Sequence, residues 1–270
     1  MSTLYVSDLD GTLLHSSERT TEYTNCVLNG LTAKGLLFSY ATARGFQTAR
    51  KVTEGLQMRL PLVVHNGVMI VDSADGRVLH KNTFGEAAKA VLDDLLSQGV
   101  QPVVYALIDG QQKLSVCGAP RVKGLRTFVE DRKTDPRLRC VDRPEELYEG
   151  EIYYFTCIDE EENLRPLYEK YRSQHRCVFD REFYTKDYWL EMMPKSATKA
   201  NAIKQLQQML NCDKVVVFGD GINDVDMFQT ADEAYAVANA CDELKQIATE
   251  VIGPNDENAV AEWLNSHTTP

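Results

Sequence analysis

Two aspartates lie two positions apart near the start of the chain, directly after a short apolar stretch. Residues 4–6 (LYV) predict a buried strand, and Gly11, which follows Asp8 and Asp10, predicts the turn that ends it. Because side chains alternate along an extended backbone, both carboxylates are expected on the same side of the strand. Two neighbouring acids contribute little to a hydrophobic core. They suit a site that holds a divalent cation, or one that divides nucleophilic and acid/base work between two groups.

A second acidic segment, residues 219–224 (GDGIND), follows another continuous apolar stretch far along the chain. It adds the carboxylates of Asp220 and Asp224 and the amide of Asn223. Together with the first two aspartates, these groups form a concentrated set of oxygen ligands. Such a set favours Mg²⁺ over zinc or copper. It also stays negatively charged until a metal ion and a basic residue balance it.

Lys199 can supply that basic group. Thr198 predicts a helix N-cap, so Lys199 falls at the first position of a helix expected over residues 199–210. A cation in the first turn opposes the helix dipole and costs about 0.3 kcal/mol or more, which favours a functional reason for it. Lys195 is a competing candidate, but it lies in the connecting loop. We therefore favour Lys199.

Polar residues also follow two further predicted strands, residues 36–40 and 62–64. Thr42 and Arg44 offer a hydroxyl and a guanidinium for phosphate oxygens or for the polar head of a substrate, and Asn66 offers an amide. In open α/β sheets the ligand site lies beyond the carboxyl ends of the strands, where these side chains would join the aspartates. A surface role for Arg44 and a turn role for Asn66 are the alternatives.

The secondary-structure pattern changes twice along the chain. Strands and helices alternate up to about residue 82 and again after Pro194, as a parallel α/β sheet requires. Between these parts, helices interleave with pairs of short strands over about a hundred residues, an ordinary domain size. We therefore expect an α+β module inserted between the two halves of an α/β domain, and such a module is well placed to cover the site.

Composition excludes some classes of function. The 270 residues carry 29 Lys and Arg against 40 Asp and Glu, a net charge of −11, which argues against nucleic acid or an anionic membrane as the main partner. The 7 cysteines are scattered and form no CxxC pair, which indicates reduced thiols and a cytoplasmic protein. No signal peptide is expected, since acids precede any apolar segment. No apolar run approaches the ~20 residues of a membrane span.

Taken together, these motifs resemble the haloacid dehalogenase (HAD) superfamily, and in particular its phosphatases. Residues 8–12 (DLDGT) match the first motif of that superfamily, Thr42 the second, Lys199 the third and residues 219–224 the fourth. The match to the Cof-type subfamily, which carries an inserted class IIB cap, rests on residues 66–67 (NG) and 239–240 (NA). The resemblance covers the predicted α/β part on both sides of the insert.

The resemblance implies a fold and an activity. The fold is α/β, a Rossmann-like parallel sheet core with an inserted α+β cap domain. We expect the catalytic core over residues 1–82 and 186–270 and the specificity-determining cap over residues 83–185. The activity is Mg²⁺-dependent hydrolysis of small phosphorylated metabolites, with sugar phosphates as the expected class.

The resemblance also implies a role for each site residue. Asp8 attacks phosphorus and forms an aspartyl-phosphate, while Asp10 protonates the leaving alcohol and then activates the hydrolytic water. The Asp8 side chain, the Asp10 backbone carbonyl and Asp220 bind Mg²⁺, with Asp224 supporting through water. The transferring phosphoryl group is held by Thr42, Lys199 and Asn223.

Two alternatives to hydrolysis stay open. A phosphomutase or phosphotransferase would pass the phosphoryl group to a second sugar, and a signalling receiver would keep it on an aspartate for a partner to recognise. In receivers, however, the accepting aspartate follows the third strand, whereas Asp8 follows the first. Asp10 also favours hydrolysis, because relatives that preserve the phosphoenzyme, such as ion-pumping ATPases, have Thr there.

Within the insert, some polar and aromatic residues are candidates for substrate contact, although a packed surface between two paired strands is the favoured account: Asp180, Tyr184, Lys186 and Trp189. His65, beside Asn66, is expected to be structural. The sequence indicates neither the physiological substrate nor the oligomeric state.

Overall fold

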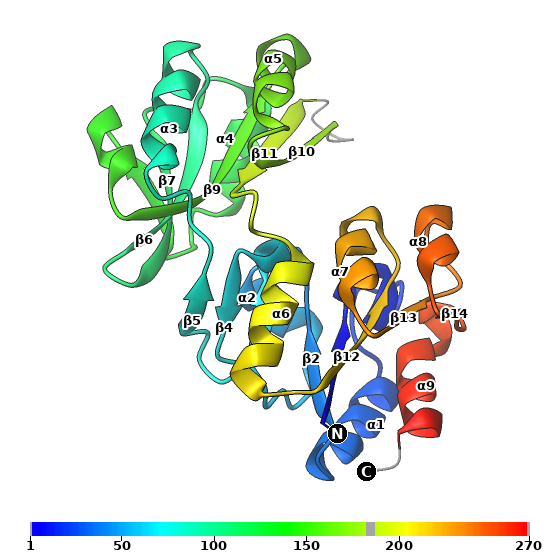
Figure 1. Ribbon diagram of the computed structural model, residues 1–270. Helices are drawn as coiled ribbons and strands as arrows, with labels where there is room; N and C mark the ends of the chain where they lie inside the picture. Colours follow the sequence, from blue (N-terminus) through cyan, green and yellow to red (C-terminus); the bar gives the residue numbers. More distant parts are fainter. Residues whose placement is uncertain (1, 182–186, 269–270) are drawn as a thin grey trace. The chain divides into compact units, whose positions relative to one another are not determined.

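The computed structural model describes residues 2–181 and 187–268. The chain divides into two compact units (Figure 1). One, here called the core unit, contains Met1–Lys81 and Ala197–Pro270; the other, the inserted unit, contains Asn82–Ser196. The first boundary lies close to the predicted one. The second lies after residue 196 instead of after 185, because β11 (Tyr188–Met193) pairs with strands of the inserted unit.

The core unit is built on a sheet of parallel strands in the order β14-β13-β12-β1-β2. Its two central strands, β1 and β12, are continuous apolar runs, as expected for parallel strands buried on both faces. They pair in register from Thr3↔Lys214 to Ser7↔Phe218, so they end at the same level of the sheet. The strands are β1 (Thr3–Ser7), β2 (Leu37–Tyr40), β12 (Lys214–Gly219), β13 (Glu233–Ala236) and β14 (Glu250–Val251).

Helices flank this sheet, and several of them follow the strand ends (Figure 1). The predicted helix over residues 199–210 has the same bounds in the structure. The helices of the core unit are α1 (Glu22–Ala33), α2 (Phe46–Val52), α6 (Lys199–Leu210), α7 (Val225–Thr230), α8 (Asp242–Ile247) and α9 (Ala259–His267).

The strand predicted at residues 62–64 has the same bounds in the structure, where it also begins a small antiparallel sheet. β3 (Leu62–Val64) makes one parallel bridge, Ala41↔Val63, and otherwise pairs antiparallel with β4 (Met69–Val71), which pairs in turn with β5 (Val78–Lys81). The chain reverses between β3 and β4 through His65, Asn66 and Gly67, whose φ angles are 51°, 54° and 92°. The predicted parallel neighbour of β3 is thus present at one bridge, whereas the reversal of the chain into β4 was not predicted.

The inserted unit contains a mainly antiparallel sheet in the order β10-β11-β9-β6-β7-β8. Residues of α3 (Ala87–Ser97) and α5 (Glu161–Tyr171) pack in one hydrophobic cluster, and residues of α4 (Lys123–Asp131) in another. Since alternate residues of β11 join different clusters, helices cover both faces of the sheet. The remaining strands are β6 (Pro102–Ile108), β7 (Gln111–Cys117), β8 (Leu138–Val141), β9 (Glu151–Asp159) and β10 (Arg176–Arg181).

The candidate substrate residues of the insert are only partly described. Asp180 and Trp189 lie opposite each other on β10 and β11, while Tyr184 and Lys186 lie outside the described residues. The Trp189 ring packs edge-on against Phe128, with 5.9 Å between ring centroids. Trp189 therefore has the packing role that the sequence analysis favoured. Within the described parts of the chain, no helix combines the length and apolar character that crossing a membrane requires.

Candidate active site

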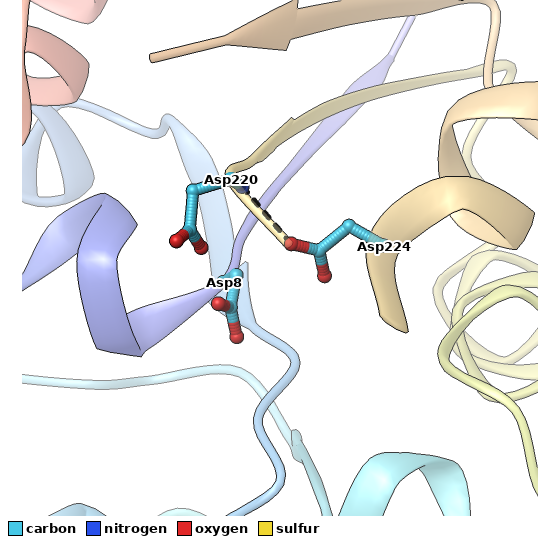
Figure 2. Close-up of side chains that lie close together, drawn as sticks. All are labelled: Asp8, Asp220 and Asp224. Atoms are coloured by element: carbon cyan, nitrogen blue, oxygen red, sulfur yellow. Dashed lines mark hydrogen bonds between the residues drawn. The ribbon is translucent and has the colours of Figure 1, made fainter. Parts of the chain in front are cut away.

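The carboxyl ends of β1 and β12 bring two aspartates together. The Asp8 amide donates to the Phe218 carbonyl oxygen at 2.9 Å, which continues the β1–β12 pairing into the site. Asp220 follows β12 at this same end of the sheet, and Asp224 comes from the turn after it. Figure 2 shows the three carboxylates gathered, and their nearest oxygens all lie within 4.8 Å of one another. The structure thus places these three residues in one cluster.

A tight turn connects β1 to the next segment. Asp10 (φ −68°, ψ 123°) and Gly11 (φ 74°, ψ −4°) have the angles of a type II turn, whose second central position requires a positive φ. A Cβ on Gly11 would also lie 2.3 Å from Asp220 Oδ2. Position 11 therefore requires glycine for two reasons: the turn needs a positive φ, and the close approach of Asp220 leaves no room for a Cβ.

Two residues without a role in the sequence-based site secure this turn. Thr12 Oγ1 donates to Asp220 Oδ1 at 2.9 Å, and Asn239 Nδ2 donates to the Gly11 carbonyl oxygen at 2.7 Å. The contact of Thr12 could have been expected from the sequence, because Thr12 is a short hydroxyl residue directly after Gly11. The sequence marked Asn239 only as part of a subfamily motif, and its contact with Gly11 was not predicted, because Asn239 lies far along the chain and only the fold brings it there.

Lys199 lies fully buried between two of the aspartates. Its Nζ donates to Asp8 Oδ1 and to Asp224 Oδ1, each at 2.6 Å. In contrast, Lys195 is exposed and its Nζ donates to the Ser173 carbonyl oxygen. Of the two lysines that the sequence offered, Lys199 is the one paired with the acidic cluster.

The start of α6 positions Lys199. The Thr198 side chain accepts from the Asn201 amide at 3.1 Å, as the sequence predicted for an N-cap. Gly67 lets this helix start approach the β3–β4 turn, because a Cβ on Gly67 would lie 2.1 Å from the Thr198 carbonyl oxygen. The Asn-Gly pair after β3 therefore helps to position Lys199, because its glycine leaves room for the start of α6.

The acidic cluster contains more negatively than positively charged groups. Burial raises the pKa of Asp8 well above its ordinary value; Lys199 opposes this rise, and repulsion from Asp224 and Asp220 adds to it. Burial also raises the pKa of Asp220, against the Thr12 hydrogen bond and with repulsion from Asp224. Burial lowers the pKa of Lys199, but attraction to Asp8 and Asp224 outweighs it and raises that pKa overall. A single lysine charge therefore does not neutralise three carboxylates.

Asp224 organises the loop that carries Asp220. Its Oδ2 accepts from the backbone amides of Asp220 and Gly221 at 3.0 and 3.1 Å, the first of which is the dashed line in Figure 2. Its Oδ1 accepts from Lys199, and the side chain is fully buried. Both oxygens are thus already used, which suits an anchoring residue beside a metal better than a direct ligand.

The predicted phosphate-binding loops are joined by hydrogen bonds. The backbone N–H of Asn66 donates to the Thr42 carbonyl oxygen at 2.8 Å, and the Asn66 side chain accepts at Oδ1 from Asn223 Nδ2 at 3.3 Å. Thr42 is fully buried, and its Oγ1 accepts from the Arg44 amide at 3.0 Å. Because a hydroxyl is also a donor, accepting this bond leaves the Thr42 O–H to donate to a phosphate oxygen.

Arg44 contacts Asp10. Arg44 Nε donates to Asp10 Oδ2 at 2.8 Å and Arg44 Nη2 donates to Asp10 Oδ1 at 2.6 Å. The sequence analysis assigned Arg44 to phosphate or to the polar head of a substrate. The structure shows its guanidinium on the other predicted catalytic carboxylate instead.

Comparison with known proteins relates nearly the whole chain to one group. A family described as haloacid dehalogenase-like hydrolase matches residues 5–264. A Bacillus subtilis protein described as a 5-amino-6-(5-phospho-D-ribitylamino)uracil phosphatase is 25% identical over 96% of this chain and 95% of its own length.

Solved structures share the fold over the same extent. A Thermotoga maritima protein superimposes with a TM-score of 0.79 at 24% identity, covering 100% of this chain and 99% of that one. A sugar phosphatase of HAD subclass IIB gives 0.69 at 21% identity, with 98% of each chain covered. The predicted fold class, a parallel α/β core with an inserted α+β module, is confirmed.

Proposed function

The chain belongs to the haloacid dehalogenase-like hydrolase family, and we propose that it is a Mg²⁺-dependent phosphatase of small phosphorylated metabolites, with sugar phosphates as the favoured class. Family membership confirms the resemblance seen in the sequence and shows that the chain is an enzyme. The observation that carries the proposal is buried Lys199, which bridges Asp8 and Asp224 beside Asp220. In this proposal the core unit, predicted from the sequence as residues 1–82 and 186–270, provides the catalytic core. The inserted unit, predicted as residues 83–185, acts as the cap that selects the substrate.

A divalent cation fits the acidic cluster. The three clustered side chains offer carboxylate oxygens, which suit Mg²⁺. Burial and, to a smaller extent, mutual repulsion raise the pKa of Asp8 and Asp220, and a cation would relieve this repulsion. We assign the Asp8 side chain, the Asp10 backbone carbonyl and Asp220 to hold it, with Asp224 in support. When bound, the ion neutralises charge on the phosphate oxygens.

Asp8 is proposed as the nucleophile. One of its carboxylate oxygens forms a bond to phosphorus while the bond from phosphorus to the alcohol oxygen breaks, which gives an aspartyl-phosphate. Lys199 supports this step because its charge, 2.6 Å from Asp8 Oδ1, favours the ionised carboxylate. Burial of both groups keeps competing water away from the nucleophile.

Asp10 is proposed as the acid/base group of both steps. It gives a proton to the departing alcohol oxygen, and then takes one from the water whose oxygen attacks phosphorus and releases Asp8. Its side chain is 46% exposed, so water can reach it. Asp10 lies in the turn after β1, whereas the Asp8 side chain is only 6% exposed, so the two neighbouring carboxylates have different surroundings, which suits different tasks.

Thr42, Lys199 and Asn223 are proposed to hold the transferring phosphoryl group. Each has a donor group, and phosphoryl transfer depends mainly on positioning and on charge neutralisation. Asn66, whose amide contacts Asn223, is proposed to support the same group.

Incubation with p-nitrophenyl phosphate and a sugar-phosphate panel in the presence of Mg²⁺ tests the function directly. We expect hydrolysis that EDTA abolishes, and no turnover by Asp8→Asn despite an unchanged circular dichroism spectrum. Inorganic phosphate should appear in the same amount as the alcohol, whereas a phosphomutase or phosphotransferase would release little of it. Failure of the wild type to hydrolyse any of these esters would refute the proposal.

A further inference from the structure

The contact between Arg44 and Asp10 is a two-point ion pair. The guanidinium approaches with Nη2 2.6 Å from Oδ1 and with Nε 2.8 Å from Oδ2 and 3.1 Å from Oδ1. A carboxylate held at both oxygens by the fork of one arginine cannot rotate about its own axis without breaking a bond. The pair therefore fixes the plane of the Asp10 carboxylate as well as its position.

The backbone of Arg44 is itself held in place. Its amide donates to Thr42 Oγ1 at 3.0 Å, and its carbonyl oxygen accepts from the His65 amide at 3.0 Å. Next to it, a Cβ on Gly45 would lie 2.8 Å from the His65 ring, so the two loops are closely packed. Arg44 thus reaches Asp10 from a loop with little freedom to move.

Glu18 adds a second acidic contact on the solvent side of Arg44. Its Oε2 lies 3.7 Å from Arg44 Nη2, and its side chain is 78% exposed. The Arg44 side chain is only 24% exposed, so the guanidinium is partly enclosed between two acids. These contacts satisfy Arg44 within the chain, without a phosphate group.

From this geometry we propose that Arg44 is a positioning residue for Asp10, and not a ligand of the phosphate. The inference rests on the proposed function and refines one part of it. Asp10 lies on a turn and is half-exposed, so without Arg44 its side chain would sample several orientations in water. An acid/base group must stay within about 2.6–3.2 Å of the oxygen that it protonates. Arg44 supplies that constraint.

The test uses the leaving group as a probe. Phenyl, p-nitrophenyl and 2,4-dinitrophenyl phosphate carry the same phosphoryl group but release phenolates that need a proton less and less. The ratio kcat/KM reports the steps up to departure of the phenolate. We expect Arg44→Gln to lower kcat/KM at least about tenfold more for phenyl phosphate than for 2,4-dinitrophenyl phosphate, since only the former depends on a well-placed acid.

A phosphate ligand would behave differently on two counts. All three substrates would lose the same factor, and inorganic phosphate would become a weaker competitive inhibitor. We expect its inhibition constant to stay within about twofold of the wild-type value in Arg44→Gln. A uniform loss together with weaker phosphate inhibition would overturn the inference, and so would the absence of any loss.

A double variant examines whether Arg44 acts through Asp10. Once Asp10 is Asn, a residue that only orients it has nothing left to contribute, so D10N/R44Q should hydrolyse p-nitrophenyl phosphate as fast as D10N. A further loss in the double variant would show a separate role for Arg44 and contradict the proposal.

Two comparisons complete the experiment. Arg50→Gln removes an exposed arginine from α2 and should keep wild-type rates on all three esters; a gradient like that of R44Q would mean that overall charge, not orientation, is responsible. If R44Q does not fold, Arg44→Lys keeps the charge without the fork, and a smaller gradient in the same direction is expected. A wild type inactive on the whole series would instead refute the proposed function, whereas a normal wild type with a uniform R44Q loss refutes this inference alone.

Discussion

Lys199 and Arg44 each pair with a carboxylate of the candidate site, but their surroundings differ. Lys199 and Asp224 are fully buried and Asp8 is nearly so, whereas the Arg44 and Asp10 side chains are 24% and 46% exposed. Removing one member of a buried ion pair leaves an uncompensated charge away from water, while exposed pairs contribute little to stability. We therefore expect the charge of Lys199 to maintain the site and the charge of Arg44 to orient a single side chain, that of Asp10.

The largest expected effect follows from breaking the buried network. Lys199→Met keeps a long apolar side chain but leaves Asp8 and Asp224 buried without their counter-charge. We expect it to lower the free energy of unfolding by about 3–5 kcal/mol and to abolish turnover. Denaturant unfolding followed by circular dichroism measures the first effect, and release of p-nitrophenol the second. Lys195→Met, at an exposed position, should change neither, and a stable K199M would contradict the account.

This network shows which part of the site could be predicted from the sequence. Asp8 and Asp220 each follow a continuous apolar run, and such runs predict central parallel strands whose ends must meet. The N-cap Thr198 likewise indicated where Lys199 would stand, and α6 begins there. The pattern placed these residues because local signals and sheet topology agreed. Their catalytic and metal-binding roles stay predictions.

Other features depended on contacts that no local pattern contains. The pairing of Arg44 with Asp10 depends on the direction of two side chains across a loop, which spacing along the chain does not fix. The inserted unit extends to residue 196 because β11 hydrogen-bonds to β9, and such long-range pairing has no signal at the boundary itself. β4 and β5 were missed because each is short, although Asp75 and Gly76 between them are a turn signal.

The next effect concerns the charge that Lys199 leaves unbalanced. A divalent cation that binds the folded chain alone stabilises it by about 2.7 kcal/mol at a hundredfold excess over its Kd. We expect Mg²⁺ to raise the Tm of the wild type, and to raise that of Asp220→Asn much less. Differential scanning calorimetry in EDTA and in Mg²⁺ measures both. An equal shift in the two proteins would show that Mg²⁺ binds elsewhere.

In the absence of metal, the pH dependence of folding stability should report the raised pKa of Asp8. The raised pKa of Asp8 means that the folded chain holds this proton more tightly than the unfolded chain does. Its contribution to stability is therefore complete below the ordinary Asp pKa and is lost as the pH rises through the raised value. In EDTA, we expect the Tm of the wild type to fall relative to that of Asp8→Asn over this range. A difference that does not change with pH would contradict the assignment.

The smallest expected effect on stability belongs to the partly exposed pair of Arg44 and Asp10, and it gives the clearest difference from the buried network of Lys199. Arg44→Gln removes a partly exposed pair, so its free energy of unfolding should change by only about 0–1 kcal/mol, well below the loss in K199M. Its effect on phenyl phosphate hydrolysis should nevertheless be large, because orientation of Asp10 affects the reaction and not the fold. Urea unfolding of R44Q and K199M under identical conditions makes the comparison. If R44Q lost as much stability as K199M, Arg44 would belong with the buried network that maintains the site, and its kinetic effect would reflect a damaged fold.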